Sequence, residues 1–491
     1  MPGTGKYNQN EDLFQKMRQS ISGRLSRTIV VQSETMKPTH RPTLVYLLTG
    51  LLLLILAGTL ILMLPISSQA GMTTNFLTAL YTSTSAVCVT GLILVDTGTY
   101  WSGFGQFVIF ILFQLGGLGF MTSATLIIAV FLGKNMSLSE RLRFRKAHLR
   151  GGLGSETVGR MGGNEARSLI INVVKLTFLI EIVGALFFCI LKLLDGSSFN
   201  LQTIWQALFT CVSAFTNAGF DIEGNFSSFT NYDSQPFILI LMSVLIIFGA
   251  TGYSIWIDVF YKRSWKLLAI DSKIVLGASL ALTIMAAVFL LVIEYNNTGI
   301  FADMSFIKSA FLSFINAIFV RTAGFTIIDY NQLPDQLLFL FSGLMFIGGA
   351  SGSCAGGIKL TTFIILGYAI TATVRGQDNV NVHRTEIPWR YVHQAFSVAL
   401  LSVGILFVTI FIISSNINAN FIDVIFESIS AFATNGTSTG LSRDLGDFSQ
   451  IVSIVTMFIG RIGPLTIALI LSERFERKQV LRYPEGEIAI G

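Results

Sequence analysis

Eight long apolar runs dominate this sequence and limit how the chain can fold. A helix needs about 20 apolar residues to cross the roughly 30 Å hydrocarbon core of a bilayer. Only 12% of the 491 residues are charged and 52% are hydrophobic, whereas soluble domains carry about 25% charged residues. The sequence therefore predicts an all-α membrane protein with eight transmembrane helices. The runs lie at about residues 44–64, 104–131, 169–194, 236–260, 274–293, 337–370, 395–413 and 450–471.

A shorter amphipathic stretch separates each odd-numbered run from the following even-numbered one. Each stretch is too short to span a bilayer, ends at a glycine and continues into a polar loop, which predicts a re-entrant hairpin. The stretches read FLTALYTSTSAVCVTGL, LQTIWQALFTCVSAFTNAGF, SFIKSAFLSFINAIFVRTAGF and NFIDVIFESISAFATNGTSTGL.

Charge differs between the two sets of loops. The linker 132–167 carries eight Lys or Arg residues, and the other even-to-odd linkers and the C-terminus are also basic, whereas the hairpin side is acidic. By the positive-inside rule, both termini are cytoplasmic and the hairpins enter the plasma membrane from outside. This organisation predicts a cytoplasmic segment at 1–43, pore repeats at 44–131, 168–261, 273–371 and 391–471, a basic cytoplasmic linker at 132–167 and a cytoplasmic tail at 472–491.

The four hairpins align on Gly91, Gly219, Gly324 and Gly436. Three of them read Ser-Ala-(Val/Phe)-x-x-x-Gly, and the third diverges. One such glycine is most simply a turn or packing residue, but four in register predict a ring of backbone carbonyls that replaces the water shell of a cation. Glycine adopts the required backbone angles at little cost. The residues expected to form this filter are Val89, Thr90, Gly91, Leu92, Asn217, Ala218, Gly219, Phe220, Thr322, Ala323, Gly324, Phe325, Thr434, Asn435, Gly436 and Thr437.

The segments SAVCVTGL, SAFTNAGF, FVRTAGF and SAFATNGTSTGLS resemble the four filter segments of the Trk/Ktr/HKT potassium transporter superfamily. The resemblance covers essentially all of residues 44–471 and is strongest to the membrane subunits of bacterial Ktr uptake systems. Glycine in all four filters implies transport of K⁺, whereas some plant members have serine in the first and favour Na⁺. Cys88 and Asn435 depart from the pattern and leave the fine selectivity, and any role of Na⁺, open.

The same resemblance implies partners that the sequence itself does not contain. It implies a homodimer in membrane lipid, docked on a cytosolic ring of nucleotide-binding, KtrA-like RCK subunits. No organic cofactor and no nucleic acid are expected.

The sixth apolar run is interrupted by five glycines between Gly348 and Gly357. Each glycine costs a helix about 1 kcal/mol relative to alanine, so the run should break near the middle of the membrane. A helix kink is the simpler alternative, but the resemblance implies an intramembrane gating loop at 348–357. Its candidate residues are Gly348, Gly349, Ser351, Gly352, Ser353, Gly356 and Gly357.

Two basic residues are further gate candidates. Lys359 follows the loop and should either bond to it or face the inner cavity. Arg461 stands near the middle of the last run, where a charge is expensive and usually faces a cavity or a partner. We expect Arg461 to repel a resting cation or to bind the carbonyls of the loop.

Arg321 stands three residues before Gly324, where the other three repeats have uncharged residues, and we predict that Glu427 on the fourth pore helix braces it. Two rival functions remain. A secondary transporter with inverted repeats is disfavoured because the four repeats run parallel. An enzyme is disfavoured because the sequence shows no catalytic constellation, and its four histidines and four cysteines have no metal-ligand spacing.

Overall fold

The computed structural model describes residues 41–132, 163–196, 198–295, 300–301, 304–377, 379–382 and 385–463. The chain divides into two units, residues 1–42 and 43–491, and the described helices belong to the second, apart from the first two residues of α2. The predicted cytoplasmic segment before residue 41, most of the basic linker and the tail lie outside the described residues.

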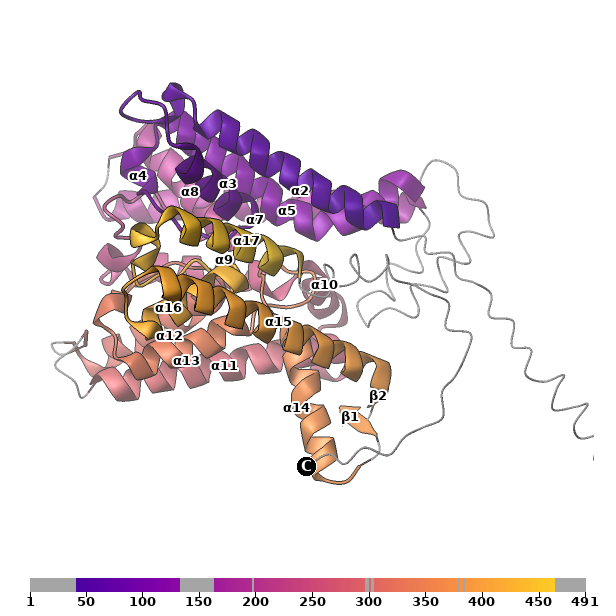
Figure 1. Ribbon diagram of the computed structural model, residues 1–491. Helices are drawn as coiled ribbons and strands as arrows, with labels where there is room; N and C mark the ends of the chain where they lie inside the picture. The colour runs from indigo at the N-terminus through magenta and orange to yellow at the C-terminus, as the bar shows by residue number, and fades with distance from the viewer. Residues whose placement is uncertain are drawn as a thin grey trace, which may run out of the picture. The chain divides into compact units, whose positions relative to one another are not determined.

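Four structural repeats follow one another along the chain. Each has an outer helix, a shorter pore helix and an inner helix (Figure 1). The outer helices are α2 (Arg41–Leu62), α7 (Gly163–Leu194), α11 (Ile270–Tyr295) and α15 (Trp389–Asn416). The pore helices are α3 (Phe76–Val87), α8 (Leu201–Thr216), α12 (Phe306–Thr322) and α16 (Phe421–Ala433). The inner helices are α5 (Gly103–Leu132), α9 (Pro236–Thr251) with α10 (Tyr253–Lys262), α13 (Asp335–Phe346) with α14 (Leu360–Val374), and α17 (Asp447–Ile462).

Short elements complete the described chain. They are the helix α4 (Thr97–Tyr100), the 3-10 turns η1 (Pro65–Ser67), η2 (Thr230–Tyr232), η3 (Trp265–Leu267), η4 (Tyr330–Gln332) and η5 (Leu441–Asp444), and the strands β1 (Val380–Val382) and β2 (Thr385–Ile387).

The repeats close into a cycle through one recurring contact. The inner helix of each repeat packs against the pore helix of the next: α5 on α8, α9 on α12, α13 on α16, and α17 back on α3. Two large apolar clusters fill the spaces between them, one centred on the second and third repeats and one on the first and second. This closure places the four pore helices around a common axis.

The pore helices begin at polar caps and end where the backbone turns sharply. The side chains of Asn75, Asn200 and Ser305 each accept a backbone N–H in the first turn of their helix, which satisfies a donor that the helix leaves open. Short pore helices are thereby fixed at one end and lead directly into the filter segments at the other.

The all-α membrane fold is confirmed, and the described part of each predicted apolar run is helical apart from two breaks. Three described helices are long and apolar enough to span a membrane alone, namely Ile171–Leu194, Ile270–Tyr295 and Trp389–Asn416. A fourth candidate is a helix pair bent by 102°, Pro236–Thr251 with Ile255–Lys262. The run predicted as a span at 236–260 is helical but sharply bent, because Gly252, with φ +82°, ends α9 and begins α10.

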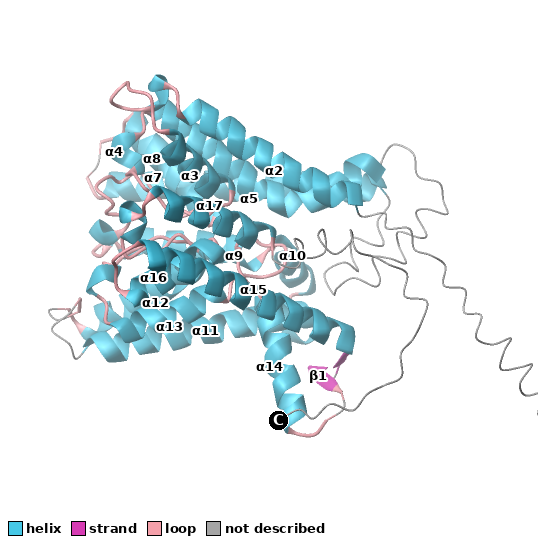
Figure 2. Ribbon diagram, in the orientation of Figure 1, coloured by secondary structure: helices cyan, strands magenta, loops and turns pink. Residues whose placement is uncertain are grey.

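The break predicted in the sixth run is present between α13 and α14, and Figure 1 shows α14 at a steep angle to α13. The linker after α14 also contains an antiparallel hairpin that the sequence analysis did not predict, drawn in magenta in Figure 2. Val380 pairs with Ile387 in this hairpin, and both are buried in a cluster with Ala369 and Ala372 of α14. The hairpin is thus fixed to the helix that follows the break.

Candidate functional site

The four aligned glycines form a closed ring. A Cβ on Gly91 would lie 3.0 Å from the Cα of Gly219, and one on Gly219 would lie 3.3 Å from that of Gly324. A Cβ on Gly324 would lie 2.9 Å from the Cα of Gly436, and one on Gly436 would return to within 3.0 Å of Gly91. All four have φ between +69° and +94°, where a side chain is strained. Both the space and the backbone angle therefore require glycine.

One backbone carbonyl from each repeat lies between neighbouring glycines of this ring. The Cβ positions of the glycines would meet the carbonyl oxygens of the residue before the next glycine, namely Thr90, Ala218, Ala323 and Asn435. Two of the side chains that follow the glycines pack against aromatic rings instead: Phe220 stacks on Phe113 and Phe325 packs edge-on against Phe229. Thr437 in the fourth repeat accepts from Asn435 Nδ2 at 2.7 Å. Oxygen atoms of the main chain therefore supply the polar surface at the ring.

The backbone before the glycine is unusual in three of the four repeats. Val89, Asn217 and Thr434 have φ of 55°, 57° and 47°, a region that costs a non-glycine residue about 1–2 kcal/mol. The third repeat differs, because Thr322 at the same position is still the last helical residue of α12 and its φ is not positive. The ring is therefore fourfold in its glycines and only approximately fourfold around them.

Two serines accept hydrogen bonds from backbone amides of the glycine ring. Ser85 and Ser430 each stand six residues before their glycine, and their Oγ atoms accept from the backbone N–H of Gly91 at 3.0 Å and of Gly436 at 3.1 Å. Ser213 occupies the same position in the second repeat, but its buried Oγ has no hydrogen-bond partner in the structure, and Ile318 takes the position in the third. The sequence alignment contained these serines without revealing their role.

Glycines of the inner helices let the pore helices come close. A Cβ on Gly116, Gly249 or Gly460 would overlap a carbonyl oxygen at the end of the adjacent pore helix, that of Val87, Phe215 or Phe432 respectively. Each of these carbonyls lies four residues before its filter glycine. The third repeat has no such contact at its inner helix, and there the helix breaks.

The segment between α13 and α14 contacts the other three repeats, including Thr434 beside the glycine ring. Ala350 N donates to Ala250 O of the second repeat at 3.1 Å, and Cys354 Sγ lies 3.9 Å from Gly117 O of the first. Gly356 leaves no room for a Cβ beside Thr434 and Ala433 of the fourth.

The two ends of the segment between α13 and α14 are joined, because Gly348 N donates to Ile358 O at 2.9 Å. Ser353 is buried, whereas Ser351 and Gly352 are exposed.

Ala250 connects this segment to the filter. The Asn217 side chain, in the amide orientation that gives its oxygen a donor, accepts from Ala250 N at 3.1 Å. The carbonyl of Ala250 accepts from Ala350 on the other side. A displacement of the segment between α13 and α14 would therefore move Ala250 and, through it, the side chain of Asn217 beside Gly219.

Both predicted basic gate residues contact backbone carbonyls. Arg461, 2% exposed, donates through Nη1 to Cys354 O and through Nη2 to Gly116 O at 2.9 Å. Lys359 Nζ donates to Ala355 O at 2.6 Å. Of the alternatives predicted from the sequence, the structure places Arg461 on the carbonyls of the loop and bonds Lys359 to the loop. The two cations hold consecutive loop residues, Cys354 and Ala355.

The predicted pairing of Arg321 with Glu427 is not formed. Arg321 Nη1 donates to Ser279 O at 2.8 Å and lies 3.3 Å from Thr283 Oγ1, both on α11. Glu427 instead accepts from Ser438 and, at 2.8 Å, from Ser442. Sequence order alone could not show that Arg321 leaves α12 on the side facing its own outer helix. Glu427 braces the segment after the fourth filter.

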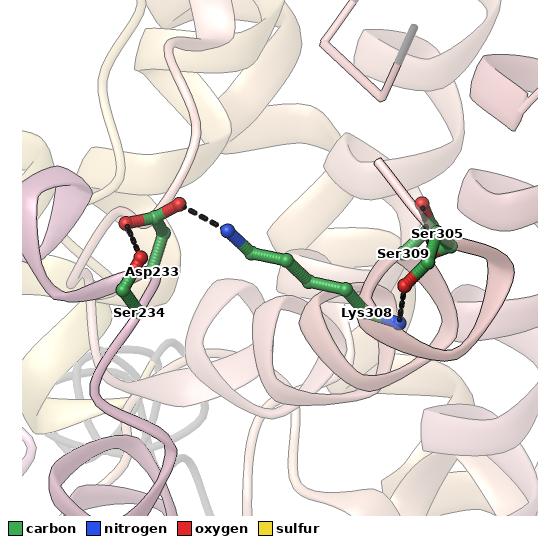
Figure 3. Close-up of polar contacts among 5 residues, drawn as sticks. All are labelled: Asp233, Ser234, Ser305, Lys308 and Ser309. Atoms are coloured by element: carbon green, nitrogen blue, oxygen red, sulfur yellow. Dashed lines mark hydrogen bonds and ion pairs between the residues drawn. The ribbon is translucent and has the colours of Figure 1, made fainter. Parts of the chain in front are cut away.

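The loops after the filters carry acidic residues. Burial raises the pKa of Asp221 to about 7, and the neighbouring charges of Glu223 and Asp96 add to the rise. Asp233 behaves in the opposite way, because a hydrogen bond from Lys308 lowers the pKa of its carboxyl. Lys308 Nζ lies 2.6 Å from Asp233 Oδ2, and Ser234 Oγ donates to the other carboxylate oxygen at 3.0 Å (Figure 3). This pair joins the second repeat to the start of α12.

The chain belongs to the TrkH family of cation transport proteins, whose model matches residues 49–483. It is 35% identical over 446 residues to the Ktr system potassium uptake protein B of Bacillus subtilis, covering 90% of this chain and 95% of that protein. It is 33% identical over 447 residues to the potassium/sodium uptake protein NtpJ of Enterococcus hirae, covering 90% and 96%. The crystal structure of the potassium transporter TrkH from Vibrio parahaemolyticus matches the fold with a TM-score of 0.68 at 18% identity, covering 90% of this chain and 87% of that one.

Proposed function

We propose that this protein carries K⁺ into the cell through the glycine ring, with no covalent chemistry. The closed ring of carbonyl oxygens from Thr90, Ala218, Ala323 and Asn435 carries this proposal. Such oxygens replace the hydration shell of a monovalent cation. The membrane potential supplies about 2.3 kcal/mol per charge per 100 mV. The names of the B. subtilis and E. hirae relatives support K⁺ as the main ion and make Na⁺ the ion to test against it.

We further propose that the segment 348–357 is the gate. It closes the path beneath the filter while Arg461 binds Cys354 O and Lys359 binds Ala355 O. A fixed guanidinium in a low-dielectric cavity also repels a cation that leaves the filter. Opening requires these contacts to be exchanged for water or other partners as the segment moves aside.

Regulation would reach the gate through α14. This helix begins directly after Lys359 and carries the hairpin β1–β2 on its side. A cytosolic KtrA-like RCK ring that docks on the basic linkers and this hairpin would move α14 and, with it, the gate. In this arrangement both termini are cytoplasmic, and membrane lipid or a second copy in a homodimer covers exposed apolar side chains such as Leu400, 77% exposed, and Phe407, 72% exposed.

Growth of a bacterium that lacks its own potassium uptake systems tests the main proposal. Expression of this protein, with a matching RCK subunit, should restore growth at low external K⁺. Absence of growth while the protein is present in the membrane would contradict K⁺ uptake. Growth that needs Na⁺ as well would favour a Na⁺-coupled or Na⁺-permeable transporter.

A further inference from the structure

A carboxyl and an amide face each other inside the helix bundle, and neither belongs to the filter or the gate. Glu181 on α7 is 1% exposed and Gln114 on α5 is 6% exposed. Gln114 Nε2 donates to Glu181 Oε2 at 2.8 Å. The remaining oxygen of each side chain, Glu181 Oε1 and Gln114 Oε1, is buried and has no donor in the structure.

This pattern of partners fits a protonated acid. An ionised glutamate is acceptor-only, and it would leave two buried acceptors with no donor between them. A proton on Glu181 supplies the missing O–H, which can donate to Gln114 Oε1 while the amide donates in return. Two hydrogen bonds then join the side chains in one ring, and no unpaired charge lies between the helices. A charged residue at membrane depth is otherwise expensive and marks a functional site.

The charged and titratable groups around Glu181 offer no compensating cation from the helices packed against it. α8 contributes Cys211, α9 has no titratable side chain, and neither does α5. On α7 itself, Lys175 and Cys189 lie six residues before and eight residues after Glu181. Cys354 of the gating segment is also within electrostatic range of Glu181.

The pair is connected to the gate by α5. Gln114 stands two residues before Gly116, whose carbonyl accepts from Arg461. Arg461 in turn binds Cys354 O in the gating segment. The conformation in which Glu181 requires a proton is therefore also the conformation in which Arg461 binds the gating segment and keeps it closed. Opening admits water to the cavity, and water solvates a carboxylate, so the open state binds this proton less tightly.

We propose that Glu181 is a proton-binding site that is protonated when the gate is closed and releases its proton to water when the gate opens. This inference rests on the proposed gating function. Linkage is reciprocal: if opening releases a proton, then a higher pH in the cytoplasmic cavity favours opening. The ligand of the site is the proton itself, and Glu181 acts as a positioning residue for the gate through Gln114 and α5.

Infrared difference spectroscopy on the full-length protein tests the protonation directly and does not depend on transport. At neutral pH the wild type should show the carbonyl stretch of a protonated carboxylic acid, and Glu181→Gln should remove it. Gln114→Leu should keep the band but shift it to higher frequency, because the hydrogen-bonded ring is lost. The matched control is Glu294→Gln, which changes another buried glutamate and should leave the Glu181 band in place. A band that Glu181→Gln does not affect would overturn the proposal.

Flux into liposomes tests the link to the gate. With external pH held constant, so that the outer carboxyls do not change, a rise in pH on the cytoplasmic face should increase wild-type K⁺ flux severalfold. Glu181→Gln should remain near the low-pH level at every pH, because its amide can form the same two-bond ring with Gln114. The proposal is overturned if this variant keeps the wild-type pH response. A wild type that carries no K⁺ under any condition would instead refute the proposed function, and the infrared result would still stand.

Discussion

At the scale of single residues, backbone geometry rather than side-chain chemistry forms the proposed filter. The four glycines that the sequence grouped together do lie in one ring, where left-handed turns leave almost no other residue possible. Their role as a filter stays a prediction. The sequence did not predict that Ser85 and Ser430 hold the amides of Gly91 and Gly436. A serine inside an apolar helix has many uses, and only its position relative to the turn shows which one applies.

Replacement of Ser430 by alanine should destabilise the backbone of the proposed filter segment around Gly436. The backbone N–H of Gly436 would lose its partner, and an unsatisfied buried donor costs about 1–3 kcal/mol. We expect a lower thermal unfolding temperature and a reduced preference for K⁺ over Na⁺ in liposome flux. Ser213→Ala is the matched control, because its equally buried Oγ has no partner in the structure. Equal effects of the two substitutions would show that the hydrogen bond does not brace the filter.

The misassigned partner of Arg321 shows where sequence reasoning ends at this scale. The prediction placed Glu427 beside it because consecutive repeats should be neighbours, and the repeats are indeed neighbours. The direction of a side chain on its helix decides the contact, however, and Arg321 turns to Ser279 and Thr283 of α11. A repeat alignment gives the order of helices but not their rotation.

At the scale of elements, the departures from fourfold symmetry are concentrated at the proposed gate, the segment 348–357. The third inner helix breaks into α13 and α14, and the second bends at Gly252 beside the gating segment, where a Cβ would lie 3.4 Å from Gly352. The first break was predictable from five glycines in ten residues. The second was not predicted, because one glycine in an apolar run is equally compatible with a straight helix. The hairpin β1–β2 escaped prediction because two strands of three residues give too short a pattern.

Gly356→Ala should open the gate more often. A Cβ at this position would overlap Thr434 Oγ1 and lie 2.9 Å from Ala433 O, so the closed segment would have to shift. Overpacking costs about 1–3 kcal/mol, and a loss of about 1.4 kcal/mol in the closed state raises the open fraction about tenfold. We therefore expect K⁺ flux to rise by up to about tenfold in liposomes.

Gly343→Ala in α13 serves as the control for this substitution. Apart from its chain neighbours and the backbone of its own helix, no atom lies within 4 Å of a Cβ at Gly343, and alanine is about 1 kcal/mol better than glycine inside a helix. Flux should stay at the wild-type level and the protein should be slightly more stable. An unchanged flux for Gly356→Ala as well would contradict the placement of the closed gate against the fourth filter.

The pair Lys308–Asp233 makes a pH-dependent contribution to stability. The pKa of Asp233 is lowered in the folded protein, so its stabilisation is present above the unfolded value of about 3.9 and is lost as pH falls through the lowered folded value. The side chains are 35% and 34% exposed, which limits the gain to about 0.2–1 kcal/mol. Lys308→Met should lower the unfolding temperature at pH 7, and the difference from wild type should shrink as pH falls below the unfolded value and through the lowered folded pKa of Asp233. Lys308→Arg should retain the wild-type unfolding temperature. A difference that persists in acid would exclude the ion pair as the cause.

At the scale of the whole molecule, the repeats close because each inner helix packs on the next pore helix. This cyclic contact brings together glycines that are separated by more than 100 residues in the sequence. The sequence predicted the number and order of the repeats, since apolar periodicity and glycine spacing are local signals. It also predicted a ring of backbone carbonyls, but it could not give the contacts of that ring, because they depend on closure between the fourth repeat and the first.

The most direct test of this account compares K⁺ and Na⁺ flux into liposomes for the wild type and Gly91→Ser. Serine at Gly91 must adopt φ +88°, and its Cβ would lie 2.5 Å from Ala218 O, so the carbonyl ring has to widen or distort. The account predicts that the wild type prefers K⁺ clearly and that the variant loses much of this preference while Na⁺ flux is maintained or rises. Unchanged selectivity in a stable, correctly inserted Gly91→Ser protein would contradict the assignment of the glycine ring as the filter.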